Sequence, residues 1–301
     1  MILLVDTNPV LEQRLKGDSF PKGARARATE KQTTPAGYGA HMAQFAGSIN
    51  EDSRLMAFFG GDVGERYKKF IEAEGIHIVA KTIRDETKER LILEEKNRKT
   101  IIETKDPRLT REDMVDFYDR FLNEAASVDA VVIAESRDAD EADEMKLPLV
   151  RYARRQSKPV IILAKEADDV EEMKEAKPFG LVVDRDVLAK KMNKPIHFLG
   201  EIASALDVLY GGEIPLILVT GSERGSILCA RGSYYFAKNE EKSGAFDAHY
   251  AAVALAVGIV RKYDAPTVLK LAHGAASTEG DADFADLKGR MNKIDVQQME
   301  V

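Results

Sequence analysis

The sequence predicts an α/β fold in which helices cover both faces of a central, mostly parallel β-sheet. Short runs of apolar residues alternate with helical patterns along most of the 301 residues, an order typical of this class. These runs are almost entirely apolar, as expected of strands that are covered on both faces. Two segments interrupt the alternation and predict a second, smaller sheet.

The core strands and helices follow one another in a regular order. Thr110, which precedes Arg111-Glu112-Asp113, suits the N-cap of a helix, and Gly75 suits a helix end. We therefore expect strands at residues 2–5, 55–59, 130–134, 160–164, 181–183 and 216–220, and helices at residues 65–75, 111–127, 143–157 and 199–212.

The two interrupting segments are residues 9–34 and 76–104. The first is polar and charged, and the second alternates apolar and charged residues without an intervening helix. Such alternation indicates an antiparallel sheet with one face in water. We expect a single domain over residues 1–301, with these segments forming a small β-sheet lid over the carboxyl ends of the parallel strands, where ligands of open α/β sheets bind.

Composition excludes several classes of protein. A net charge of −7 argues against nucleic acid or an anionic membrane as the main partner. The chain has one cysteine, Cys229, so an internal disulfide framework is excluded, and its five histidines do not have metal-site spacing. The apolar stretch 249–260 is shorter than the ~20 residues that span a bilayer. The first residues look like a core strand and not a signal peptide, so we expect a cytoplasmic protein.

Two glycine-containing turns are candidate ligand-binding elements. Residues 220–225, Thr-Gly-Ser-Glu-Arg-Gly, connect two strands, and their glycines would let backbone approach a phosphate or a base. A simple hairpin explains this turn equally well. Gly37 and Gly39 open a helix within residues 33–47, where Tyr38 and His41 would face a ligand. A connector with an incidental histidine is as good an interpretation.

A further turn, Gly244-Ala245-Phe246-Asp247, leads into the apolar stretch near the C-terminus. Unpaired N–H groups at a helix start form a site for anions. They could hold the charge of a transferring phosphoryl group, while Asp247 takes a proton from the attacking hydroxyl. The alternative is that Asp247 does no more than stabilise the helix terminus.

The order of these motifs resembles the ribokinase-like (phosphofructokinase B) carbohydrate kinases, in particular their 1-phosphofructokinase and tagatose-6-phosphate kinase branch. The resemblance implies a three-layer ribokinase-like sandwich, ATP-dependent phosphorylation of a sugar or sugar phosphate with Mg²⁺, and a homodimer formed through the lid. It is carried by residues 7–12, 35–43, 58–65, 85–92, 176–183, 218–226, 243–252 and 268–277.

The resemblance also implies roles for individual residues. Asp247 would be the general base, and Gly244, Ala245 and Phe246 would complete the anion hole around it. Asp184 and Asp186 would lie near the metal. The nucleotide would contact Thr220, Gly221, Gly225, Gly274 and Ala275, and the sugar would contact Glu12, Gly37, Tyr38, Gly39, His41 and Lys88.

The sequence departs from the family pattern at this site. Phe246 replaces a glycine, Tyr38 replaces a lysine, Glu12 replaces an aspartate, Lys88 stands where arginine is usual, and Val187 replaces a metal-linked glutamate. We favour a working kinase over a catalytically impaired homologue that binds a sugar or nucleotide as a sensor or partner module. A dinucleotide-dependent oxidoreductase is poorly supported, because the first strand lacks a following G-x-G-x-x-G turn.

Overall fold

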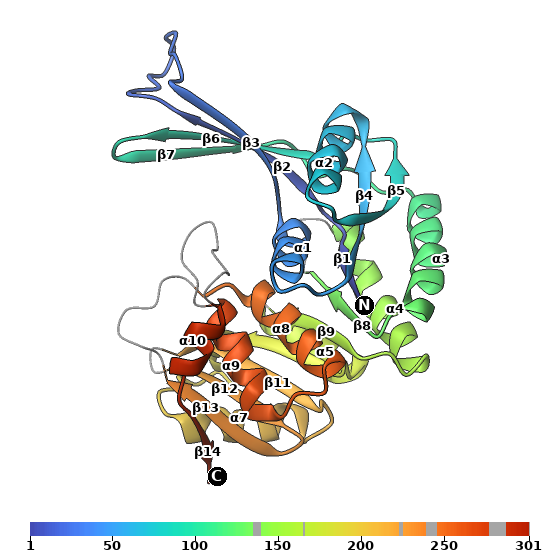
Figure 1. Cartoon of the computed structure of the whole chain (residues 1–301), viewed down its shortest axis with the longest axis vertical. Helices are drawn as coiled ribbons and strands as arrows, with labels where there is room; N and C mark the ends of the chain where they lie inside the picture. The colour runs from blue at the N-terminus through green and yellow to red at the C-terminus, as the bar shows by residue number, and fades with distance from the viewer. Residues whose placement is uncertain (135–139, 165, 223–224, 239–245, 277–286, 301) are drawn as a thin grey trace.

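The computed structural model describes residues 1–134, 140–164, 166–222, 225–238, 246–276 and 287–300. They form a body built on a ten-stranded sheet, from which a separate four-stranded sheet projects (Figure 1). The strand order is β14-β13-β12-β11-β10-β9-β8-β1-β4-β5 in the large sheet and β3-β2-β6-β7 in the small one.

The large sheet is parallel from β11 to β5 and antiparallel beyond β11. All six predicted core strands are confirmed, and so is the α/β class. The parallel strands are β1 (Ile2–Asp6), β4 (Ser53–Gly60), β5 (His77–Ile83), β8 (Ala130–Ile133), β9 (Val160–Ala164), β10 (Gly180–Asp184) and β11 (Leu216–Ser222); the antiparallel ones are β12 (Gly225–Ala230), β13 (Ser233–Lys238) and β14 (Val296–Met299).

Helices bury both faces of this sheet, which gives three layers. In β1, Leu3 and Val5 point into one hydrophobic core, while Ile2 and Leu4 point into the other. The first core is closed by α3 (Arg111–Ser127), α4 (Asp140–Arg155), α5 (Ala167–Ala176), α6 (Arg185–Lys191) and α7 (Leu199–Tyr210), and the second by α1 (Tyr38–Ser48), α2 (Gly61–Ala73), α8 (Ala248–Val260), α9 (Ala265–Ala276) and α10 (Leu287–Lys293).

The small sheet contains β2 (Val10–Lys16), β3 (Glu30–Ala36), β6 (Lys88–Glu95) and β7 (Arg98–Glu103). The outer pairs β2–β3 and β6–β7 are antiparallel, but the central pair β2–β6 is parallel. The expectation of an antiparallel sheet therefore holds for the two hairpins and is wrong for the contact between them. The two hairpins therefore meet through β2 and β6, which run in the same direction.

The boundary 76–104 for the second lid segment also needs correction. Its first strand, β5, pairs in parallel with β4 and is an edge strand of the large sheet. The sequence pattern misleads here because an edge strand with one partly wet face alternates like a strand of the small sheet: Val79 and Ile83 are buried, while Thr82 on the opposite face is exposed. The projecting part of this segment begins at Lys88.

Helix α8 is deeply buried in the second core. Residues 251–258 are all buried, and the helix packs against α1, α9 and the central strands. Its N-terminus follows Asp247, as the sequence predicts. Among the described residues, no helix is both long and apolar enough to cross a membrane.

His273 of α9 is buried beside this core and affects stability at acidic pH. Its Nδ1 lies 2.9 Å from the Ser226 hydroxyl, and burial lowers the pKa of the imidazole to about 4. The unfolded chain takes up this proton below about pH 6.5, whereas the folded chain resists until about pH 4. Protonation therefore favours the unfolded state as the pH falls through this window.

We predict that His273 removes about 2 kcal/mol from the free energy of unfolding between pH 7 and pH 5. His273→Asn keeps an acceptor for Ser226 but cannot titrate, so it should lose correspondingly less stability over this range. Urea unfolding at both pH values measures the difference. His77→Asn, at an exposed histidine, is the matched control and should behave like the wild type; equal pH dependence in both variants would contradict the prediction.

Candidate active site

Asp247 occupies the N-cap of α8, at the carboxyl end of the parallel strands. Its Oδ1 accepts a hydrogen bond from the backbone N–H of His249 at 2.8 Å. The Nδ1 atom of the same histidine lies 3.2 Å from this oxygen. Within the described part of the chain, Oδ2 accepts no hydrogen bond, and the side chain is 29% exposed. One oxygen of this carboxylate is thus held in place, while the other is available.

The surroundings of Asp247 keep it ionised. Burial raises the pKa of its carboxyl, but the hydrogen bonds and charge of His249, with a smaller contribution from His41, bring the pKa below its usual value. The group is therefore a carboxylate at neutral pH. It can accept a proton or a hydroxyl hydrogen bond there.

The first turn of α1 lies against the first turn of α8. The rings of Tyr38 and His249 are stacked, with their centroids 3.6 Å apart and their planes 13° apart. His41, one turn further along α1, faces Tyr250 at 6.3 Å between ring centroids. The structure thus brings the predicted residues Tyr38 and His41 next to Asp247. It also adds His249, to which the sequence alone assigns no role.

Asp6, at the end of β1, explains the glycines at the start of α1. Its Oδ2 accepts from the N–H of Gly39 at 2.8 Å, and its Oδ1 accepts from the N–H of Asn8 at 3.0 Å. A Cβ on Gly39 would lie 2.5 Å from the Asp6 Cβ, and Gly37 has a φ of 86°. These glycines let the chain approach Asp6, so the structure gives them a packing reason, and their contact with a ligand stays a prediction.

Phe246 and Asp247 are the described part of the predicted anion hole; Gly244 and Ala245 lie outside the described residues. The Phe246 ring is 6.2 Å from that of His273, measured between centroids. The N–H of Asp247 donates to the carbonyl of Ala276 at 2.9 Å, which ties the start of α8 to the end of α9. The Asp247 carbonyl in turn accepts from the N–H of Ala251 at 3.4 Å, so the backbone of Asp247 is held at both its amide and its carbonyl.

Asp184 and Asp186, which are predicted to lie near a metal, already have partners within the protein. Asp184 Oδ1 accepts from the Asp186 N–H at 2.8 Å as the cap of α6, and its Oδ2 accepts from the Thr220 hydroxyl at 3.3 Å. Asp186 pairs with Arg185 at 2.8 Å on the surface. No group of three or more His, Cys, Asp or Glu side chains suited to a metal ion occurs among the residues described.

The residues predicted to contact a nucleotide fall into two places. Thr220 and Gly221 end β11 beside Asp184, and a Cβ on Gly221 (φ 73°) would lie 2.0 Å from the Asp184 carboxylate. Gly225 begins β12, where a Cβ would meet the carbonyl of Ala237 at 1.9 Å, so sheet packing already requires glycine. Gly274 and Ala275 are buried in α9, and the nearest atoms to a Cβ at Gly274 belong to Ile294 and Leu287.

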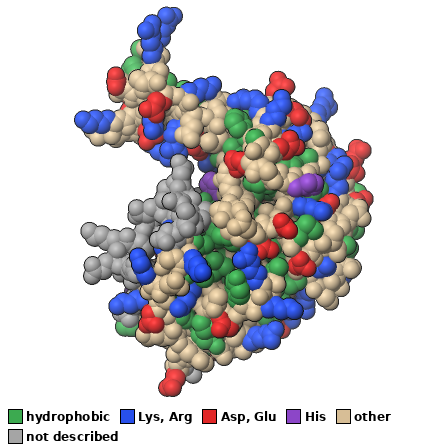
Figure 2. All heavy atoms as spheres, viewed as in Figure 1, with side chains coloured by type: hydrophobic (Ala, Val, Ile, Leu, Met, Phe, Trp, Pro, Cys, Tyr) green, Lys and Arg blue, Asp and Glu red, His purple; other side chains and the backbone are tan. Residues whose placement is uncertain are grey.

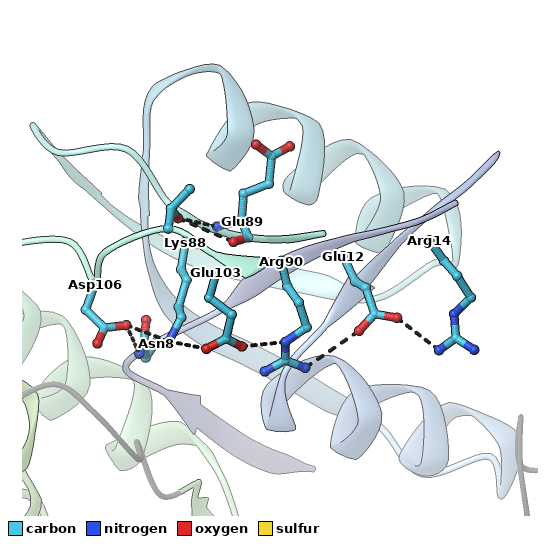
Figure 3. A network of polar contacts seen from close by, with 9 residues as sticks. Asn8, Glu12, Arg14, Lys88, Glu89, Arg90, Glu103 and Asp106 are labelled. Carbon is cyan, nitrogen blue, oxygen red and sulfur yellow. Dashed lines mark hydrogen bonds and ion pairs between the residues drawn. The ribbon is translucent and has the colours of Figure 1, made fainter. Parts of the chain in front are cut away.

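Glu12 and Lys88 belong to a chain of ion pairs along the small sheet (Figure 3). Lys88 Nζ lies 3.0 Å from Asp106 and 3.4 Å from Glu103. Arg90 bridges Glu103 at 2.6 Å and Glu12 at 3.6 Å. Burial lowers the pKa of Lys88, but Asp106 and then Glu103 raise it above its usual value, so this buried amine stays charged. Glu12 and Lys88, two of the predicted sugar contacts, thus each already have a partner of opposite charge.

Lys and Arg side chains lie at the projecting end of the small sheet (Figure 2). The N-termini of α1 and α8 bring Asp247, Tyr38 and His41 together. Asp184, Thr220 and Gly221 form a second group at the ends of β10 and β11, and Glu12 and Lys88 a third on the small sheet. The signal for His249 in the sequence is its spacing of two residues from Asp247, which lets it bond the capping carboxylate.

Comparison with known sequences gives a consistent assignment. The family model described as pfkB family carbohydrate kinase matches residues 9–279. A tagatose-6-phosphate kinase from Staphylococcus epidermidis is 23% identical over 245 residues, which cover 80% of this chain and 76% of that protein.

Solved structures show the same fold. A Staphylococcus aureus chain provisionally named a phosphofructokinase superposes with a TM-score of 0.88 at 14% identity, covering 100% of this chain and 99% of that one. Phosphofructokinase-2 from Escherichia coli, solved with fructose-6-phosphate, has a TM-score of 0.81 at 12% identity, with 97% and 98% covered. A Thermotoga maritima chain provisionally named a 1-phosphofructokinase has a TM-score of 0.76 at 19% identity, with 99% of each covered. The predicted ribokinase-like architecture is confirmed.

The contact between Gly221 and Asp184 leads to a stability prediction. Gly221→Ala places a methyl group against the Asp184 carboxylate, which must then leave the cap of α6 and the Thr220 hydroxyl. Gly75→Ala has a similar φ of 78° with no atom within 4 Å of the added Cβ, so it isolates the backbone cost of about 1–2 kcal/mol.

We expect Gly221→Ala to lower the free energy of unfolding by roughly 1–3 kcal/mol more than Gly75→Ala does. Urea denaturation of the two variants and the wild type measures this difference. Equal losses would show that the Asp184 contact does not constrain the turn.

Proposed function

The chain belongs to the pfkB family of carbohydrate kinases, and we propose that it transfers the γ-phosphoryl group of ATP to a hydroxyl of a sugar or sugar phosphate. The family supports the sugar kinase role, and the tagatose-6-phosphate kinase among its relatives supports a phosphosugar acceptor. ATP is the donor that a kinase of this family implies.

The observation that carries the proposal is the state of Asp247. It is an ionised carboxylate with one oxygen fixed by its own helix and the other unengaged among the described residues. In phosphoryl transfer the attacking hydroxyl carries little charge, so orientation of that hydroxyl matters more than the strength of the base. A carboxylate with a lowered pKa is therefore adequate as the general base.

The helix start supplies the second element of the mechanism. The N-terminus of α8 carries partial positive charge, which favours an anion bound at that end of the helix. A phosphoryl group approaching Asp247 would gain from this charge, while Oδ2 orients the acceptor hydroxyl. Because Asp184 and Asp186 already have partners within the protein, we derive no step through Mg²⁺.

One observation favours a second candidate, a homologue that binds a sugar or nucleotide without turnover. Asp184 and Asp186 are committed to a helix cap, a hydroxyl and an arginine, and Val187 is buried in the core. This candidate predicts that ligands raise the melting temperature while no acceptor is phosphorylated.

Asp247→Asn tests the proposed mechanism. Asparagine also caps helices well, so the fold should remain, but it cannot take up a proton. We expect kcat to fall at least about a hundredfold, with nucleotide-induced thermal stabilisation retained, in an assay of ADP release over a panel of sugars and phosphosugars.

The pH dependence gives an independent check on the same residue. Because the pKa of Asp247 is lowered, the active carboxylate form is lost only as the pH falls through that lowered value, well below neutrality.

Turnover at the wild-type rate in Asp247→Asn would reject Asp247 as the base. Ligand binding without any turnover in the wild type would favour the second candidate.

We also propose that the projecting sheet pairs with that of a second copy. Its outer strand β7 ends the sheet, and Ile101 and Ile102 are 53% and 51% exposed there. Exposed strand edges with apolar side chains are suited to pairing between chains. We expect sedimentation velocity to show a dimer that Ile102→Lys weakens at least about tenfold in Kd. Val208→Lys, at another exposed apolar residue, is the control. A wild-type monomer would contradict this arrangement.

A further inference from the structure

The contact between α1 and α8 contains an aromatic arrangement that the proposed reaction does not use. Tyr38 begins α1, and its ring covers that of His249 at 3.6 Å with an angle of 13°. His249 is 4% exposed, whereas Tyr38 is half-buried. Close parallel stacking of this kind restricts the rotation of both rings.

The position of the imidazole is further determined by Asp247. The backbone N–H and the ring Nδ1 of His249 both face Asp247 Oδ1, at 2.8 Å and 3.2 Å. When Nδ1 carries a hydrogen, the carboxylate oxygen accepts from two donors of one residue. Tyr38 prevents the ring from turning away, so the side-chain donor stays aligned with the carboxylate.

We propose that His249 is a positioning residue for Asp247, and that Tyr38 acts as the clamp that holds the His249 ring. This inference rests on the proposed function. It gives Tyr38 a role different from the sugar contact that the sequence suggests. With Oδ1 committed to His249, the carboxylate presents Oδ2 to the acceptor hydroxyl in one orientation.

Other groups around Asp247 bear on its titration. From α1, His41 adds a favourable charge interaction with the carboxylate, and Tyr38 lies on the far side of the imidazole. From α9, the carbonyl of Ala276 accepts the Asp247 N–H, and His273 faces the neighbouring Phe246. His249 is the member of this set that bonds the carboxylate through a side chain, and its removal should have the largest effect.

A set of substitutions separates the hydrogen bond from the stacked ring. His249→Phe keeps a ring under Tyr38 but removes the donor to Asp247. His249→Asn offers an N–H near the position of Nδ1 without the ring. Tyr38→Phe keeps the clamp, and Tyr38→Leu removes its flat face. His77→Phe makes the same chemical change at an exposed histidine of β5 and serves as the control.

The first measurement does not need turnover. Carbon-13 NMR of the aspartate carboxyls follows the titration of Asp247 in the protein without ligands, and the signal is identified by its loss in Asp247→Asn. We expect His249→Phe to raise the pKa of Asp247, His249→Asn to raise it less, and His77→Phe to leave it unchanged.

The second measurement compares kcat and KM. A hydrogen bond to a charged group corresponds to about tenfold to a hundredfold in rate when it acts on the reacting geometry. We expect His249→Phe to lower kcat by that factor with a small change in KM, and His249→Asn to recover most of the loss. Tyr38→Phe should retain more of kcat than Tyr38→Leu, because phenylalanine keeps the flat face that stacks on His249 and leucine removes it.

The outcomes distinguish this inference from the proposed function. An unchanged Asp247 titration in His249→Phe overturns the positioning role, and so does a fall in kcat that His249→Asn does not recover. A loss in Tyr38→Leu that occurs entirely in KM overturns the clamp and returns Tyr38 to the substrate. Absence of wild-type turnover on every acceptor overturns the proposed function, whatever the carboxyl titration shows.

Discussion

The burial of α8 is the constraint on which the candidate site depends. This helix is apolar around its whole circumference and packs between the sheet, α1 and α9. Its start must therefore lie at the carboxyl edge of the parallel strands, and its first turn cannot move without opening the core. The carboxylate of Asp247, at the N-cap, is therefore held in a fixed position. The position of Asp247, on which the proposed chemistry depends, thus follows from the packing of an apolar helix.

Local pattern is sufficient to predict most of the fold. The continuous apolar runs that predict β1, β4 and β8 to β11 describe strands buried on both faces, and such runs have few alternative structures. The prediction for β5 is wrong because alternation reports which side of a strand is wet and says nothing about the partner strand. The same pattern occurs in an edge strand of the large sheet and in β6. Pairing partners are decided by tertiary contacts that a single sequence does not contain.

The candidate site is predictable in part, for a related reason. Asp247 and the glycines at the start of α1 stand out because their residue types suit helix termini. What surrounds them depends on distant segments: Gly39 is small because Asp6 lies against it, and Tyr38 meets His249 across two helices. The sequence presents Lys88 as a cation for a ligand, but folding of the β6–β7 hairpin brings Glu103 to it, and the segment that follows brings Asp106.

Polar contacts join the segments that connect the small sheet to the body. Asp106, which follows β7, accepts from the side chain of Asn8, which precedes β2, and also pairs with Lys88 at the start of β6. These contacts join two of the connections into one stiff base. We expect the small sheet to rotate about this base as a rigid body. The displacement of its residues should then grow toward the tip, while distances within the sheet stay constant. Spin labels placed at the base and at the tip would report such a motion as a change in their distances to the body alone.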